Sequence, residues 1–333
     1  MTMRTRATAR GLELTELGLG AAQFGNLYRE TTLAEVAETV DVAWEAGIRY
    51  FDTAPHYGLG LSERRLGEQL RSRPRDEYLL STKVGKMLVP SPERAHLRDD
   101  EGFDVPAETR RVFDFSRDAV LRSIEQSLDR LGLDRLDIAY LHDPEKHFDQ
   151  ASTEGIGALI ELREQGVLGA VGAGMNFGAP MAELIRRADV DLVMCAGRFT
   201  LLDGEALDDL LPLALERNVG IVVAGVYNSG LLGRDRPKPD ATFDYGPAPA
   251  ELIARANRIA DICEAHGVSL PAAAMNYVFR HPAVVCVVMG ARGGTQASQN
   301  IERYETTIPE AVWRELAAAE LIRDIPNLGK DQA

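Results

Sequence analysis

The sequence predicts a single-domain (β/α)8 barrel that spans residues 1–333. Amphipathic helical segments alternate with short apolar runs along the chain. These runs, such as LDIAYLH and GIVVAGV, are apolar at successive positions, which is typical of parallel strands that helices cover on both faces. Eight such runs occur within about 300 residues, and that number favours a closed barrel over an open sheet.

The first predicted helix has signals at both of its ends. It lies in TTLAEVAETVDVAWEAG, where Thr32 and Glu35 form a capping box and Gly47 supplies the stop. Its apolar side chains recur at helical spacing and therefore fall on one face: Val36, Val40, Ala43 and Trp44.

The later helices follow the same pattern. Ser116 caps the segment SRDAVLRSIEQSLDRLG, Gly132 ends it, and an apolar stripe lies between them: Val120, Leu121, Ile124, Leu128 and Leu131. The segments STEGIGALIELREQG and EALDDLLPLALERN predict two more helices. Pro212 lies inside the latter and predicts a kink or a late start there. A helix over 309–323 closes the chain.

The strands and one long connection complete the prediction. Strands are expected near residues 16–21, 48–52, 78–83, 136–142, 167–173, 190–195, 220–225 and 284–289. The connection over 85–115 is polar, contains prolines and is far longer than the others, so it is either a lid or a disordered loop. We favour a lid, because the segment leaves the same end of the barrel as the polar residues described below.

Composition excludes several function classes. The net charge is −14 and the pI is about 5.0, which counts against a nucleic-acid surface or an anionic membrane surface. No window reaches the ~18 apolar residues of a membrane span. The three cysteines are far apart, so no metal site is expected, and they fit buried thiols of a reducing compartment: Cys195, Cys263 and Cys286. No apolar stretch follows the arginine-containing N-terminus, so a cytoplasmic location is expected.

Three consecutive predicted strands end in polar residues. Asp52, Lys83 and His142 stand at these ends, which is the side of a (β/α)8 barrel where chemistry takes place. Adjacent parallel strands lie about 4.8 Å apart, so the three side chains should converge. Tyr57, in the loop after Asp52, can reach the same point. Each residue alone has an ordinary structural explanation, but four at neighbouring strand ends predict an active site.

The charges of these residues suggest their chemistry. A tyrosine titrates near pH 10, and a lysine beside Tyr57 would favour the phenolate and lower the pKa. Asp52 would keep Lys83 charged and fixed, and a neutral His142 could donate a hydrogen bond to a carbonyl or hydroxyl oxygen. Tyr57 could then exchange a proton with the oxygen of a carbon that gains or loses a hydride. No side chain carries hydride, so a nicotinamide cofactor is expected.

These residues resemble those of a known family. DTAPHYG, Lys83 and His142 are similar to the catalytic tetrad of the aldo-keto reductase superfamily, and the similarity extends from about Leu17 to Asn300. GLGLSERRLG, AGRFTLLD and VYNSGLL resemble the aldose 1-dehydrogenase branch, which acts on L-fucose, D-threo-aldoses or galactose, and also a pyridoxal-oxidising group. The resemblance implies oxidation of an aldose C1 hemiacetal to a lactone. Aldehyde or ketone reduction, pyridoxal oxidation and a non-catalytic binding barrel are the alternatives.

The resemblance also implies a dinucleotide site without a Rossmann domain. The implied contacts lie at strand ends and in the loops that follow them: Gly20, Ala21, Asp52, Asn176, Tyr227, Asn228, Ser229, Gly230, Leu231, Gly290, Ala291, Arg292 and Asn300. The chain departs from the family where a glutamine is frequent, since Ala196 stands there. Gly290 and Gln296 replace a lysine and an arginine common in NADP-binding members, so NAD is favoured over NADP.

The expected partner is a small sugar or carbonyl compound. Phe24, His56, Tyr57 and His142, together with the segment 85–115, are expected to shape its pocket. Nothing in the sequence predicts a membrane partner, a nucleic acid or an oligomeric state.

Overall fold

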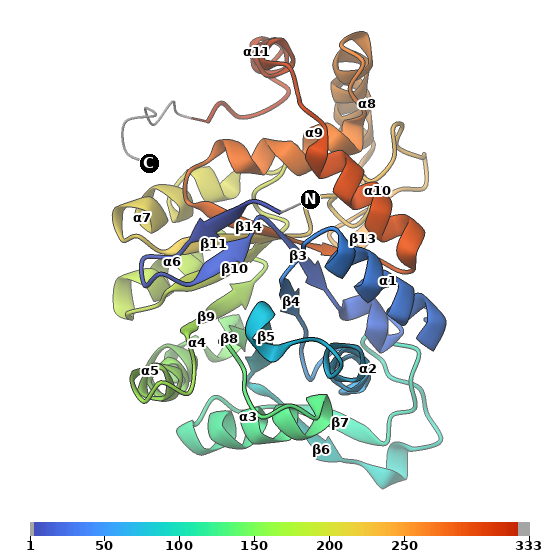
Figure 1. Cartoon of the computed structure of the whole chain (residues 1–333). Coiled ribbons are helices and arrows are strands. Elements are labelled where there is room, and N and C mark those ends of the chain that lie inside the picture. The colour runs from blue at the N-terminus through green and yellow to red at the C-terminus, as the bar shows by residue number, and fades with distance from the viewer. Residues whose placement is uncertain (1–2, 326–333) are drawn as a thin grey trace.

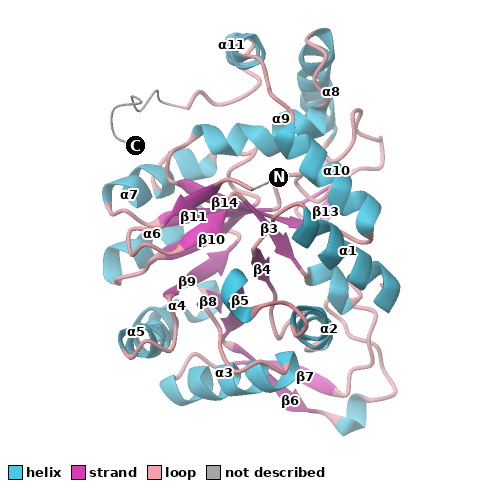
Figure 2. Ribbon diagram, viewed as in Figure 1, coloured by secondary structure: helices cyan, strands magenta, loops and turns pink. Residues whose placement is uncertain are grey.

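The computed structural model describes residues 3–325 and shows eight parallel strands that close into a barrel. Helices surround the strands (Figures 1 and 2), and the predicted (β/α)8 barrel is confirmed. The barrel strands are β3 (Leu17–Gly20), β4 (Tyr50–Asp52), β5 (Leu79–Val84), β8 (Ile138–His142), β9 (Ala170–Met175), β10 (Leu192–Ala196), β11 (Gly220–Ala224) and β14 (Val284–Gly290). Hydrogen bonds between β14 and β3 close the ring.

The helices agree with the sequence pattern except near their ends. The principal ones are α1 (Leu33–Glu45), α2 (Leu61–Leu70), α3 (Arg117–Leu131), α5 (Ile156–Glu164), α6 (Gly178–Arg187), α7 (Leu210–Glu216), α8 (Ala250–Ala265), α9 (Leu270–Tyr277), α10 (Gly294–Glu305) and α11 (Glu310–Ala318). The capping box of α1 is present. The late start at Pro212 is also confirmed, because α7 begins only at Leu210 after a separate 3-10 turn. The predicted last helix is shorter than expected, since α11 ends at Ala318.

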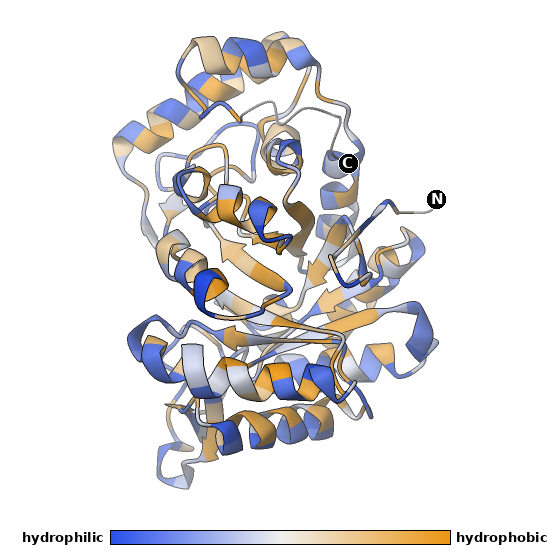
Figure 3. Cartoon of the chain, turned by 90° about the vertical axis from the view of Figure 1, so that its left-hand side faces the viewer, coloured by the Kyte–Doolittle hydropathy of each residue, from blue (hydrophilic) through white to orange (hydrophobic). Residues whose placement is uncertain are grey.

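Apolar side chains fill the barrel and the layer between strands and helices. Figure 3 shows the strands coloured mainly as hydrophobic and the helices as a mixture of both kinds. Tyr50 and Tyr140 are fully buried inside the barrel, where their hydroxyls lie 3.1 Å apart. An N-terminal hairpin of β1 (Thr5–Ala7) and β2 (Glu13–Thr15) leads into the start of β3 and buries Leu14 in the same interior cluster. The N-terminal end of the barrel is thereby closed.

Two hairpins stand at the opposite end of the barrel. β6 (Lys86–Pro90) and β7 (Thr109–Phe113) pair antiparallel over five residues within the segment predicted as a lid. β12 (Thr242–Phe243) and β13 (Gly246–Pro247) pair over two residues in the connection after β11. The segment 85–115 is therefore ordered, and its loop forms a bridge between Phe103 and Leu27.

The described residues contain neither a membrane-spanning helix nor a metal-binding group of side chains. Within residues 3–325, no helix has the length and apolar character needed to cross a bilayer. In the same range, no group of histidine, cysteine and acidic side chains is placed to hold a metal ion. The three cysteines are buried and free.

Candidate active site

The structure brings the three predicted strand-end residues to one point of the barrel rim. β4, β5 and β8 are consecutive in the barrel, and they carry Asp52, Lys83 and His142 near their C-terminal ends. Asp52 is opposite Ser81, and Lys83 is opposite Tyr140. β5 continues one residue beyond Lys83, to Val84.

Asp52 and Lys83 form a buried ion pair. Lys83 Nζ lies 2.5 Å from Asp52 Oδ2, and the two side chains are only 2% and 3% exposed. Lys83 also donates to the carbonyl of Thr53 at 3.0 Å, and Ser81 Oγ donates to Asp52 Oδ1 at 2.7 Å. Burial lowers the pKa of Lys83, but Asp52 and then Tyr57 raise it more, so its pKa lies above the ordinary value. Lys83 is therefore a fixed positive charge.

Tyr57 lies over this charge. Lys83 Nζ is 4.8 Å from the centre of the Tyr57 ring, and the ring of His142 is 5.8 Å away from it. Burial raises the pKa of Tyr57 to about 12, although Lys83 acts in the opposite direction. The expectation of a lowered pKa is therefore wrong for the protein alone, because removing the phenol from water outweighs the attraction of one ammonium.

A close backbone contact holds the loop of Tyr57 in place. Gly58 follows Tyr57 with a left-handed φ of 63°, and a Cβ there would lie 2.3 Å from the carbonyl oxygen of Gly25. A Cβ on Gly25 would meet the carbonyl carbon of Tyr57 at 2.5 Å. Only glycine at both positions allows this approach, so the loop carrying Tyr57 packs directly on the turn after β3.

Two histidines form a neutral wall beside Tyr57. The rings of His56 and His142 lie 5.3 Å apart, edge to face. Burial, and then the ammonium of Lys86, lowers the pKa of His56 to about 2 and the pKa of His142 well below its ordinary value. Both rings are neutral at physiological pH, as expected for His142, so each carries one N–H that can donate.

The segment 85–115 contributes to this wall through a buried ion pair. Arg111 on β7 donates to Asp99 at 2.5 Å and 3.1 Å and to the carbonyl of His56 at 2.8 Å. Phe103 packs edge to face on His56, with ring centres 5.3 Å apart. The predicted substrate residue Phe24 is placed differently, because it is fully buried in the core and exposes no surface.

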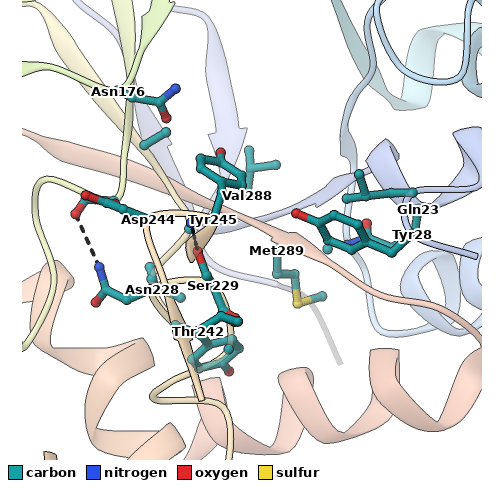
Figure 4. A pocket seen from close by; sticks show the side chains of 18 residues that line it. Gln23, Tyr28, Asn176, Asn228, Ser229, Thr242, Asp244, Tyr245, Val288 and Met289 are labelled. Atoms are coloured by element: carbon teal, nitrogen blue, oxygen red, sulfur yellow. Dashed lines mark hydrogen bonds between the residues drawn. The ribbon is translucent and has the colours of Figure 1, made fainter. Parts of the chain in front are cut away.

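A cavity of about 660 Å³ opens on the same rim, beyond the ends of β9, β10, β11 and β14. Figure 4 shows polar and aromatic side chains around it. Six residues that the sequence suggested for the cofactor line it: Asn176, Tyr227, Asn228, Ser229, Gly230 and Gly290. Residues that the sequence did not single out also line it, among them Gln23, Tyr28, Thr242 and Tyr245.

The other suggested cofactor residues lie behind or beside this cavity. Ala21, Leu231 and Ala291 are buried, and Gly20 ends β3 against Val288. Asn300 accepts a hydrogen bond from the Tyr227 hydroxyl at 3.1 Å and so supports a residue of the cavity wall. Arg292 donates to the carbonyl of Leu27.

The cavity offers polar groups that fit a nicotinamide dinucleotide. Gln23 Oε1 and Asn228 Oδ1 are buried side-chain atoms of its wall without a hydrogen-bond partner in the described chain, and such atoms mark places where a ligand group can bind. A Cβ on Gly290 would lie 2.6 Å from Gln23 Nε2, so a side chain there would displace the amide of Gln23. Asn228, Ser229 and Gly230 are successive left-handed residues, which curve the backbone around the cavity.

Sequence reasoning expected the segment 85–115 at the pocket but did not single out Lys86, Phe103 and Arg111 within it, and it missed Asp143. A signal existed for Lys86 and Asp143, because Lys86 follows Lys83 by three residues and Asp143 follows His142 directly. Phe103 and Arg111 gave none, since their position over His56 depends on how a long polar connection folds.

Known proteins resemble this chain along nearly its whole length. The Aldo/keto reductase family model matches residues 16–320. A D-threo-aldose 1-dehydrogenase from Pseudomonas sp is 47% identical over 319 residues, which cover 95% of this chain and 97% of the relative. A pyridoxal 4-dehydrogenase from Microbacterium luteolum is 40% identical, with 95% and 97% covered. The solved holo structure of an aldo-keto reductase from Bacillus halodurans superposes with a TM-score of 0.74 at 25% identity, covering 96% and 97% of the two chains.

Proposed function

This chain belongs to the aldo/keto reductase family and is an oxidoreductase, and we propose that it oxidises the C1 hemiacetal of an aldose to a lactone. The convergence of Tyr57, Lys83, Asp52 and His142 at one point of the rim carries the proposal. The substrate class is taken from the aldose dehydrogenase that is 47% identical to this chain.

Each of the four side chains has its own role in the transfer of one proton. Tyr57 takes the proton of the C1 hydroxyl as the C1–H bond breaks and the C1=O bond of the lactone forms. Lys83 stabilises the negative charge of the tyrosine oxygen, and Asp52 holds Lys83 in place. His142 donates a hydrogen bond to the C1 oxygen and orients it. A nicotinamide dinucleotide, when bound, accepts the hydride that no side chain can take.

The cavity wall is the proposed site of that dinucleotide. Asn176, Tyr227, Asn228 and Gly290 would hold it, with Gln23 and Asn228 offering unpartnered oxygens. We favour NAD over NADP because a 2′-phosphate needs a free positive charge. Arg292 is instead directed to the carbonyl of Leu27, and its own backbone N–H donates to Gln296 at 2.8 Å.

Oxidation is expected to accelerate with pH. Tyr57 must be ionised to accept the proton, and burial raises its pKa to about 12. The ionised fraction, and with it kcat/KM for oxidation, should therefore rise about tenfold per unit between about pH 7 and pH 10. Carbonyl reduction needs the protonated form and should stay level over this range. Initial rates in both directions across this range test the expectation, and a plateau in oxidation below about pH 9 contradicts it.

The proposed function is tested by the absorbance of the reduced dinucleotide. Purified protein is mixed with NAD⁺ or NADP⁺ and with L-fucose, D-arabinose, L-xylose, galactose or pyridoxal. Absorbance that rises with an aldose supports the proposal and reports the preferred dinucleotide. Turnover of pyridoxal alone, or consumption of reduced dinucleotide by simple aldehydes alone, replaces it with one of the other two oxidoreductase activities.

A further inference from the structure

A further ion pair, in which Lys86 is buried and Asp143 is partly exposed, lies beside His142 and has no part in the proton transfer. Lys86, the first residue of β6, places its Nζ 2.6 Å from Asp143 Oδ2. The same carboxylate oxygen is 3.6 Å from His142 Nε2. The pair therefore borders the side chain that is proposed to orient the reacting oxygen.

One member of this pair can be reached from outside. The side chain of Asp143 is 30% exposed, whereas that of Lys86 is 7% exposed. Asp143 also has a left-handed backbone with a φ of 44°, which is uncommon for a residue other than glycine. Its N–H donates to the carbonyl of Gly174 at 3.0 Å, so the neighbouring strand β9 fixes this conformation. Such backbone conformations are found at functional sites more often than elsewhere.

Three side-chain atoms around the pair are buried and have no hydrogen-bond partner within residues 3–325: His56 Nδ1, His142 Nδ1 and Glu145 Oε1. His142 borders the pair directly, since its Nε2 lies 3.6 Å from Asp143 Oδ2, and the ring of His56 lies 5.3 Å from that of His142. After burial, Lys86 is the strongest influence that lowers the pKa of each histidine. Burial raises the pKa of Glu145, and Asp143 adds to that increase. Buried polar atoms of this kind mark groups that a bound molecule can satisfy.

The charges around the pair select the kind of group that binds. Lys86 is balanced by Asp143, and Arg111 is balanced by Asp99 and by Glu101, which lies 3.5 Å from Arg111 and 3.7 Å from His56 Nδ1. Glu145 adds a further negative charge nearby. A bound phosphate or carboxylate would be repelled by these acids and would find no cation without a partner. A hydroxyl group can donate to a carboxylate or imidazole nitrogen and accept from an ammonium at the same time. Neutral hydroxyl groups therefore match the site.

We propose that the Lys86–Asp143 pair, together with His56, binds substrate hydroxyl groups next to the reacting carbon and makes the enzyme selective for hydroxylated substrates. The aldose part of this inference rests on the proposed function. The selectivity itself does not, because a preference for hydroxylated substrates would apply in either direction of the reaction.

Two aldehydes that differ in their hydroxyl groups test the inference: glyceraldehyde and propanal. Both are reduced with the preferred dinucleotide by wild-type protein, Lys86→Met and Asp143→Asn. We expect the ratio of kcat/KM for glyceraldehyde to kcat/KM for propanal to fall about tenfold or more in each variant, mainly through KM for glyceraldehyde. Lys146→Met is the control, since Lys146 is exposed and forms no ion pair in the described part of the chain, and its ratio should equal that of the wild type.

The outcomes separate this inference from the proposed function. Equal losses for both aldehydes, or an unchanged ratio, would overturn the inference and leave Lys86 a structural charge. Failure of the wild type to oxidise any aldose would instead overturn the proposed function, while the aldehyde ratio would still decide the role of the pair. Melting curves identify a variant that does not fold, and Asp143→Asn, which preserves side-chain size, then carries the test.

Discussion

Tyr57→Phe is expected to lower kcat for aldose oxidation about 10³-fold and to leave dinucleotide binding unchanged. The change removes one oxygen and keeps the ring that packs on His142 and Phe103. No other group can replace the lost base, because both histidines have lowered pKa values and Lys83 is held as a cation. Steady-state rates give the loss of turnover, and quenching of protein fluorescence by the dinucleotide gives binding. The expected loss of about 10³-fold in kcat corresponds to what a positioned acid–base group contributes to a rate.

Tyr78→Phe is the matched control for this prediction. Tyr78 is buried against Trp44 and Phe51, and its hydroxyl has no hydrogen-bond partner in the described residues. Its removal should leave kcat within about twofold, since no interaction is lost. Turnover near the wild-type level in Tyr57→Phe would show that the proton leaves by another route.

Lys83→Met is expected to abolish turnover and also to destabilise the fold. The change leaves the carboxylate of Asp52 buried without its cation, which costs about 3–5 kcal/mol for pairs of this kind. Ser81 still donates to Asp52 at 2.7 Å, but one neutral donor does not replace an ammonium. Urea denaturation followed by circular dichroism measures the stability, and the sugar assay measures turnover.

Combining Lys83→Met with Asp52→Asn separates the two effects. The double variant has no buried charge at this point, so it should recover most of the lost stability. It should remain inactive, because no positive charge is left to stabilise the ionised Tyr57. A double variant as unstable as Lys83→Met would mean that lost packing, and not the unpaired charge, causes the destabilisation.

Periodicity predicted the regular parts of this protein well. The helix of Thr32 to Gly47 and the apolar strands are defined by local spacing and capping, which tertiary structure did not override. The convergence of Asp52, Lys83 and His142 followed from strand order alone. Helix spacing, caps and the order of the strands can all be read directly along the sequence.

The remaining features depend on contacts between distant segments. The pKa of Tyr57 was predicted in the wrong direction because burial by the segment 85–115 and the neighbouring loops is a property of the whole fold. The hairpins β6–β7 and β12–β13 were not predicted, since KMLVP and TRRVF lie inside a long connection and β12 and β13 have only two residues each. Phe24 has no exposed surface because it lies within the main hydrophobic core cluster, a packing detail that spacing does not reveal.

The two hairpins on the rim differ in how firmly they are attached, and this difference has a consequence for motion. The β6–β7 hairpin has five paired positions and the buried Arg111–Asp99 ion pair. The β12–β13 hairpin has two paired positions and is joined to the barrel rim by Asp244, which is 43% exposed, and Arg198. Local opening requires less free energy where few buried contacts are broken. Amide hydrogens of β12–β13 should therefore exchange with deuterium faster than those of β6–β7. Equal rates would contradict this difference. The expected order means that a dinucleotide in the cavity would enter and leave while the wall formed by His56 and His142 stays still.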